Sequence, residues 1–322
     1  MRKVYNYLKI FFPPFLGVFF IYLSINITSV EERKLIISYI KNADLKYIII
    51  SIIFGILSHL SRAFRWKYLL LPLGYNPKFI NSILAVLISY IANLGIPRSG
   101  EILRATTLSS YEKIPFEKLF GTIIAERIVD LLILLSLIFL SFSLQFELVW
   151  KVLNKSPIFL KTLSIGAPLL FFIFLVVKWF LKKSNSKISL KIKAILKGFI
   201  EGIMSIKNMP FKFNFIVHTV FIWLMYFGMF FIIKWTIPEM EKLELEYLLL
   251  TFVIGGLTLT ATNGGIGIYP LSVAMTLSFF GISNESGLAF GWIVWTSQTL
   301  MILFFGSLSF FILPLVNKRN QS

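Results

Sequence analysis

Long apolar segments alternate with short polar stretches along this chain of 322 residues. An α-helix needs about 20 apolar residues to cross the roughly 30 Å of hydrocarbon in a bilayer. Segments of this kind lie near residues 10–28, 44–61, 119–144, 158–181, 212–236 and 288–313. The pattern therefore predicts an all-α integral membrane protein, a polytopic helical bundle with about six full spans.

Lysine and arginine gather in the polar stretches between these segments. Basic residues are concentrated near the N-terminus, in residues 62–78 and 182–197, and in the C-terminal tail, whereas residues 237–246 are rich in glutamate. Positively charged loops stay on the cytoplasmic side of a membrane. We therefore expect both termini inside and the acidic stretch outside.

Two further apolar segments lie near residues 79–111 and 247–282. Each must begin and end on the same face of the membrane if the charged loops are to stay on the faces assigned to them. Each segment is interrupted where a turn can form, at 95–100 (GIPRSG) and at 262–267 (TNGGIG). Glycine and proline permit such turns. We expect two re-entrant helical hairpins that enter from opposite faces, as in an inverted-repeat transporter. The alternative is that both segments are short full spans, which gives about eight spans.

The composition agrees with a membrane protein and narrows its chemistry. Charged residues make up 15% of the chain, which contains 34 Phe, and the mean hydropathy is +0.81. The net charge of +17 is spread over several loops, so it does not indicate nucleic-acid binding. Without cysteine, and with only His59 and His218, the chain offers no metal site and indicates no cofactor.

One connecting segment has a pattern of its own. Residues 182–209 alternate lysines with apolar residues, which favours a basic cytoplasmic helix that lies in the membrane interface. A solvated connector is the alternative. Because every loop is too short for a separate core, we expect residues 1–322 to form a single transmembrane domain.

Charged residues inside the apolar segments are the main functional signal. Leaving an ionised side chain at mid-bilayer costs at least about 2.5 to 3.5 kcal/mol, so such residues usually face a protein-lined or aqueous cavity. They occur in three groups, and the members of each group fall on one helical face or close to it. The groups are Arg62 with Arg65, then Arg98, Glu101 and Arg104 at the first turn, and then Glu126, Arg127 and Asp130.

Each group has a structural alternative. Arg62 and Arg65 are also explained as interface anchors beside Trp66. Glu126, Arg127 and Asp130 either form ion pairs that brace the first hairpin or handle protons or substrate. Arg98 and Arg104 are the strongest ligand candidates, because a guanidinium binds phosphate through a bidentate fork and keeps its charge.

The series RAFRWKYLL, NLGIPRSGEILRA, TIIAERIVDLL and GGIG, in this order, resembles the lysylphosphatidylglycerol synthase transmembrane-region family, a flippase-like group. The resemblance extends over nearly the whole chain. It implies a polytopic protein of the bacterial inner (cytoplasmic) membrane that moves lipids or lipid-linked precursors between leaflets. By position, the matching motif residues are Arg98, Gly100, Glu101, Arg104, Glu126, Arg127 and Asp130, followed by Gly264, Gly265 and Gly267 in the second turn.

The chain departs from the family pattern in two ways. Asn263 precedes the second set of glycines, and Tyr269-Pro270 stands where the family typically has a glutamate. If that acid couples transport elsewhere, coupling here differs or uses Glu101 or Glu126. The soluble aminoacyl-transferring domain of bifunctional relatives is also absent from the sequence, so we expect no synthesis of an aminoacyl lipid.

These observations favour a membrane translocator of an anionic phospholipid or a polyprenyl-phosphate-linked lipid. Arg98 and Arg104 would bind the phosphate, Glu101 would orient one arginine, and the glycine turn with Asn263 would receive the headgroup on the other side. Two alternatives remain: an intramembrane transferase acting on a lipid phosphate, and a non-transporting accessory protein of envelope synthesis. No catalytic motif or nucleophile–base pair supports an enzyme. The sequence leaves homo-oligomerisation and an envelope-synthesis partner open.

Overall fold

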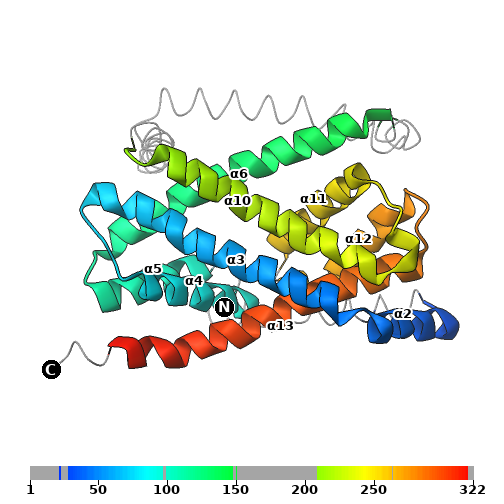
Figure 1. Cartoon of the computed structure of the whole chain (residues 1–322), viewed down its shortest axis with the longest axis horizontal. Helices are drawn as coiled ribbons and strands as arrows, with labels where there is room; N and C mark the ends of the chain where they lie inside the picture. Colours follow the sequence, from blue (N-terminus) through cyan, green and yellow to red (C-terminus); the bar gives the residue numbers. More distant parts are fainter. Residues whose placement is uncertain are drawn as a thin grey trace, which may run out of the picture. The chain divides into compact units, whose positions relative to one another are not determined.

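The computed structural model describes residues 28–96, 99–147, 209–262 and 264–317, together with Tyr22 and Trp150. The chain forms two units, Met1–Ile123 with Met209–Ser322, and Ile124–Asn208. Helices make up the secondary structure of these described residues, which include no strand (Figure 1). They are α2 (Val30–Asn42), α3 (Leu45–Leu70), η1 (Leu71–Leu73), α4 (Phe79–Gly95), α5 (Ser99–Glu112), α6 (Phe116–Leu144), α10 (Lys212–Phe231), η2 (Ile232–Thr236), η3 (Pro238–Met240), α11 (Leu245–Ala261), α12 (Ile268–Ser278) and α13 (Asn284–Asn317).

The all-α membrane architecture expected from the sequence is confirmed. Three described stretches are long and apolar enough to span a membrane: Leu45–Leu73, Lys212–Thr236 and Asn284–Asn317. The helix expected near 119–144 is α6, with 29 residues. The segments expected near 10–28, 158–181 and 182–209 lie largely or wholly outside the described residues.

One boundary differs from the sequence prediction in a way that matters for the site. The helix expected to end near residue 61 continues to Leu70. Arg62, Arg65 and Trp66 therefore belong to a helix and not to a cytoplasmic loop. The segment Leu45–Leu70 contains neither proline nor an internal turn signal, so nothing in the backbone stops the helix where the charges begin.

Helix α2 was not expected. Its first turn is closed by a capping box, in which Ser29 Oγ accepts a hydrogen bond from the Glu32 N–H and the Glu32 carboxylate accepts one from the Ser29 N–H. The hydrogen bond from the Ser29 backbone lowers the pKa of Glu32. Ile36 is buried against the core formed by α11, α12 and α13.

Both predicted hairpins are present as pairs of helices joined by a short break. In the first, α4 packs against α5, and in the second, α11 packs against α12. The breaks fall at the turns expected from the sequence. Whether each hairpin re-enters one face of a bilayer stays a prediction.

The hairpins belong to different cores of the first unit. Helices α4 and α5 share a core with Trp66 and Leu70, which lie at the C-terminal end of α3. Helices α11 and α12 share a core with the N-terminal half of α13. Ile36 and Ala43, which precede the N-terminal end of α3, belong to the same core. The hairpins therefore occupy opposite ends of α3 (Figure 1).

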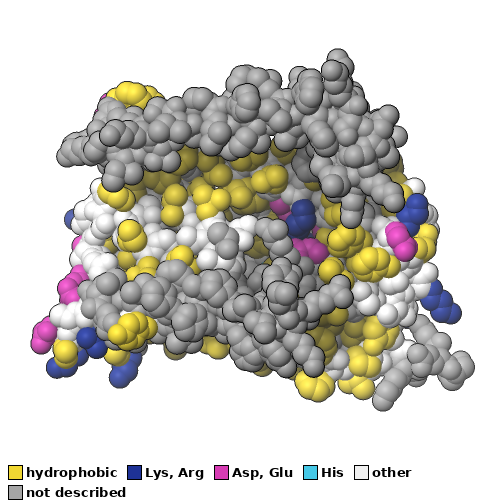
Figure 2. All heavy atoms as spheres, turned by 180° about the vertical axis from the view of Figure 1, so that it is seen from behind, with side chains coloured by type: hydrophobic (Ala, Val, Ile, Leu, Met, Phe, Trp, Pro, Cys, Tyr) yellow, Lys and Arg dark blue, Asp and Glu magenta, His cyan; other side chains and the backbone are white. Residues whose placement is uncertain are grey.

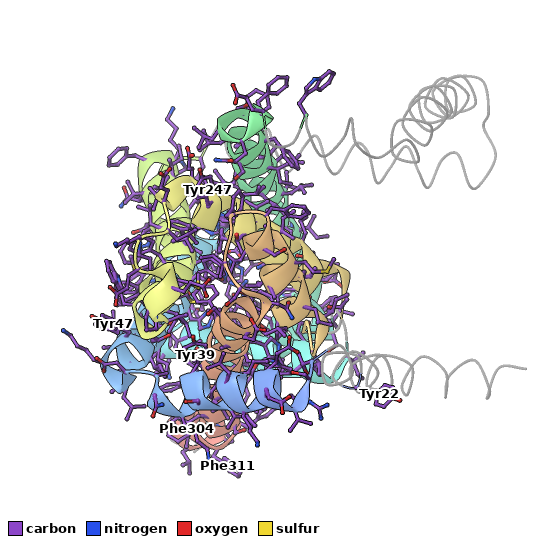
Figure 3. All side chains as sticks on the ribbon, turned by 90° about the vertical axis from the view of Figure 1, so that its right-hand side faces the viewer. Tyr22, Tyr39, Tyr47, Tyr247, Phe304 and Phe311 are labelled. Atoms are coloured by element: carbon purple, nitrogen blue, oxygen red, sulfur yellow. The ribbon has the colours of Figure 1, made fainter. Side chains whose placement is uncertain are left out.

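Outward-facing side chains are apolar, as expected for helices in contact with lipid. Hydrophobic side chains cover much of the described surface seen in Figure 2. Phe304 and Phe311 lie on the outer side of α13, where they are 61% and 73% exposed (Figure 3). Aromatic rings at such positions favour acyl chains over water.

Small residues bring α12 and α13 into backbone contact. A Cβ added to Gly291 would lie 2.6 Å from Cα of Pro270, and one added to Gly287 would lie 2.8 Å from Cα of Ala274. Glycines four residues apart are a common means of close helix packing in membranes.

We expect Gly291→Ala to lower the free energy of unfolding by about 1 to 3 kcal/mol, because the added methyl group meets backbone that has no room to move. Thermal or denaturant unfolding in detergent measures this effect. Gly256→Ala is the matched control, since a Cβ at Gly256 meets nothing within 4 Å. Equal stability of the two variants would contradict the close contact.

Candidate functional site

Three arginines are buried in the first unit. Arg62 is 3% exposed and Arg65 is not exposed at all, both on α3, while Arg104 on α5 is 2% exposed. An anchoring arginine keeps its guanidinium in water or among headgroups. Burial of the whole side chain therefore argues against the interface-anchor interpretation of Arg62 and Arg65.

Arg104 lies over the ring of Trp66. Its guanidinium carbon is 3.8 Å from the centre of the Trp66 ring, which is a stacking distance. The indole is held in turn, because Trp66 Nε1 donates a hydrogen bond to Thr122 Oγ1 over 2.9 Å. These two contacts link α3, α5 and the first turns of α6.

Arg65 turns toward α10. Its Nη1 donates to Thr219 Oγ1 over 3.3 Å, and its guanidinium carbon lies 5.5 Å from the centre of the Phe215 ring. The Thr219 hydroxyl donates to the Phe215 carbonyl oxygen, so its oxygen is oriented to accept from the arginine. A hydroxyl and a ring thus receive this charge within the bundle.

Arg62 begins a chain of polar rings across three helices. Its Nη2 donates to the hydroxyl of Tyr226 on α10 over 3.0 Å, and that hydroxyl lies 2.9 Å from the hydroxyl of Tyr90 on α4. The Tyr90 ring packs on His59, with 4.3 Å between ring centres. Neither ring nitrogen of His59 has a hydrogen-bond partner among the described residues.

The sequence analysis did not identify the aromatic and hydroxyl groups that receive the arginines. Thr219 and Tyr226 are seven residues apart, so they share one face of α10. This spacing of two polar side chains in an apolar helix is the signal that could have identified them. Tyr90 offered no comparable signal, because a single tyrosine in a membrane helix is common.

The first turn is partly described. Arg98 lies outside the described residues. Gly100 lies where α5 crosses α4: its N–H donates to Asn93 Oδ1 over 2.8 Å, and an added Cβ would overlap the Ser89 carbonyl oxygen. Glu101 is half-buried in the first turn of α5, one turn before Arg104. The structure thus supports a packing role for Gly100.

The second turn is built on glycines in the left-handed region. Gly264, Gly265 and Gly267 have φ angles of 67°, 71° and 72°, which other residues rarely adopt. The Gly264 carbonyl oxygen accepts a hydrogen bond from Trp295 Nε1 over 2.7 Å. Asn263 lies outside the described residues, and Tyr269, at the position of the family acid, is buried.

The members of the acidic group differ in burial, and two of them form an ion pair. Glu126 is fully buried and Asp130 is 9% exposed, whereas the Arg127 side chain is 44% exposed. Arg127 Nη2 lies 3.7 Å from Asp130 Oδ2, so an exposed arginine pairs with a buried carboxylate one turn further along α6. Arg127 points out of the buried environment because it is adjacent to Glu126 on the helix, about 100° around its axis.

The structure also contains one nucleophile–base pair that the sequence did not reveal. Ser61 Oγ lies 2.8 Å from His218 Nδ1, and the imidazole packs beside Phe64 and Tyr68. Within the described residues, no carboxylate is hydrogen-bonded to this ring and no group of three His, Asp or Glu side chains is suited to a metal. The Ser61–His218 contact joins α3 to α10.

Comparison with known proteins gives a clear family match. The sequence model of a family described as "Lysylphosphatidylglycerol synthase TM region" matches residues 10–306. A UPF0104 membrane protein of Methanocaldococcus jannaschii is 36% identical over 112 residues, which are 34% of this chain and 32% of that protein. The chain thus spans about a third of the length of this curated relative. No solved structure matches.

The stacked pair can be tested with a double-mutant cycle. We expect Trp66→Leu and Arg104→Gln to be coupled by about 1 to 2 kcal/mol in the free energy of unfolding, because the desolvated cation–π contact requires both side chains. Trp66→Leu combined with Lys234→Gln is the control, since buried Lys234 belongs to η2 and donates to Leu243. Additive effects in the first cycle would rule out a direct Trp66–Arg104 interaction.

Proposed function

Because the chain belongs to the lysylphosphatidylglycerol synthase TM-region family, we propose that it translocates an anionic phospholipid or a polyprenyl-phosphate-linked lipid between the leaflets of a membrane. The observation that carries this proposal is the burial of Arg62, Arg65 and Arg104 together in one unit of apolar helices. Arginine is not deprotonated in proteins, so these residues hold permanent positive charge inside the bundle. A phosphate headgroup is the anion that a membrane supplies.

The geometry at Arg104 suits a phosphate. The Arg104 guanidinium carbon lies 3.8 Å from the centre of the Trp66 ring, and the N–H donors of a guanidinium lie in its plane. A guanidinium binds two phosphate oxygens through a bidentate fork. Because Arg62 and Arg65 lie on the same helix as Trp66, their charge adds to the attraction for the anion.

The remaining charged residues receive roles within the same proposal. Arg98 binds the phosphate together with Arg104, and Glu101 orients one of the two. Glu126 and Asp130 either brace the first hairpin or exchange a proton during the cycle, and their burial gives each protonation change a large energetic effect. The backbone at Gly264–Gly267 receives the headgroup on the opposite side. Lipid tails stay in hydrocarbon throughout.

The proposal includes a topology in a cytoplasmic membrane, with both termini and the first hairpin on the cytoplasmic side. The chain has no cysteine, so single cysteines report position without background.

We expect a cysteine at Ser110 to react with an impermeant maleimide only from the cytoplasmic side and a cysteine at Glu241 only from outside, since both positions are exposed. Labelling of sealed vesicles of both orientations measures this. Reaction of Ser110→Cys from outside would contradict the re-entrant first hairpin.

Reconstitution tests the function itself. We expect purified protein in liposomes to speed the leaflet exchange of fluorescent phosphatidylglycerol or fluorescent polyprenyl phosphate, with fluorescent phosphatidylcholine, whose zwitterionic headgroup has no net charge, as the comparison. Arg104→Lys should lower the rate by at least about tenfold, because a lysine keeps the charge but loses the fork and the flat stacking. Extraction of the outer-leaflet probe by albumin gives the rate.

Arg33→Lys is the matched control and should transport at the native rate, because the half-buried Arg33 side chain donates to backbone carbonyl oxygens at the start of α2. Absence of exchange with either anionic probe would overturn the proposed function. Chemical conversion of the probe, followed by mass spectrometry, would instead identify an enzyme.

A further inference from the structure

The turns of the two hairpins meet inside the first unit. A Cβ placed on Gly264, in the second turn, would lie 3.2 Å from Cδ2 of Leu94, which is the last residue but one of α4. The contact joins residues 170 positions apart in sequence. It brings the C-terminal end of α4 against Gly264, which follows α11.

Leu94 and Gly264 belong to hairpins that have different cores. The first hairpin packs with the C-terminal end of α3 and the second with the elements around its N-terminal end. Helix α3 has 26 residues, about 39 Å at a rise of 1.5 Å each, so it is long enough to place both hairpins along a bilayer. Figure 1 shows the α4–α5 and α11–α12 hairpins toward opposite ends of α3.

We propose that the contact between Leu94 and the Gly264 turn is the closed barrier of the translocation path, which must part for a headgroup to cross. This inference rests on the proposed function. The barrier is tight, since the distance leaves no room for a phosphate between the turns. Trp295 is the positioning residue: its indole N–H holds the Gly264 carbonyl oxygen at 2.7 Å and so keeps the second turn against the first.

The local structure permits such a movement. Both turns are breaks between helices, so parting them disrupts no continuous helix. Gly264, Gly265 and Gly267 have no side chains to clash as their dihedral angles change. Hinges of gating elements are a few residues at the ends of helices that absorb such changes.

Covalent locking tests the barrier. In the full chain, Leu94→Cys is combined with Gly264→Cys and treated in liposomes with a short bis-methanethiosulfonate, which links two close thiols and is removed by a reducing agent. We expect exchange of fluorescent phosphatidylglycerol, read by albumin extraction, to fall at least about tenfold on linking and to return on reduction. Each single cysteine variant, treated in the same way, is the control, and its own rate should be the same before and after treatment.

The outcomes separate this inference from the proposed function. Linked protein that transports as fast as its reduced form would overturn the barrier but leave the proposed function standing. Two thiols that each react with a monofunctional reagent yet do not link would also overturn it. No transport by the native chain would overturn both.

A second measurement avoids any residue at Gly264, where a side chain would be strained. Leu94→Cys is combined with Trp295→Phe, which keeps a ring but removes the N–H donor. We expect the thiol at position 94 to react several-fold faster with a methanethiosulfonate than in Leu94→Cys alone, because the second turn is no longer held. An unchanged rate would overturn the positioning role of Trp295.

Discussion

Placing permanent positive charge inside an apolar bundle is the constraint on which the described part of the structure depends. An arginine surrounded by hydrocarbon costs at least about 2.5 to 3.5 kcal/mol, and the cost falls only if other groups receive the charge. Here the Trp66 ring contacts Arg104, Thr219 accepts a hydrogen bond from Arg65, and Tyr226 accepts one from Arg62. In each case the two side chains belong to different helices. Lipid-facing apolar surfaces do not specify how a helix is rotated about its axis. The contacts of the three arginines specify this rotation for α3, α5 and α10.

The two hairpins are alike in architecture but not in chemistry. The buried arginines all belong to the half of the unit around α4 and α5 and the C-terminal part of α3. In the other half, the buried cation among the described residues is Lys234, which donates to the Leu243 carbonyl oxygen and lies near the Phe231 and Trp235 rings. A lysine binds an anion as a point charge, without a fork. An inverted arrangement of helices therefore does not imply that a headgroup meets equal sites on its two sides.

The sequence predicted the elements better than their contacts. Apolar length and the Gly/Pro breaks gave α3, α6, α10, α13 and both hairpins, because these signals are local. The same signals missed the extension of α3 to Leu70, since a loop was inferred from charge alone and the charges proved to be buried. They also could not show that Tyr90 and Tyr226 lie hydroxyl to hydroxyl, because that pairing depends on how separate helices rotate and pack. Charge in an apolar chain indicated where a site lies, and tertiary packing decided what completes it.

Helix α13 contacts both hairpins through glycines, and this has a mechanical consequence. At one end Gly291 allows its backbone to touch Pro270 of α12, and nearer the other end a Cβ on Gly306 would lie 3.1 Å from the Leu87 carbonyl oxygen of α4. Because α12 and α4 both pack closely against α13, a displacement of α13 affects both contacts. Sliding α13 along its axis by even one residue would press side chains into both seams, so one hairpin cannot be repositioned this way without the other. Glycine is usually associated with flexibility. Here the glycines of α13 permit close contacts that couple the positions of the two hairpins.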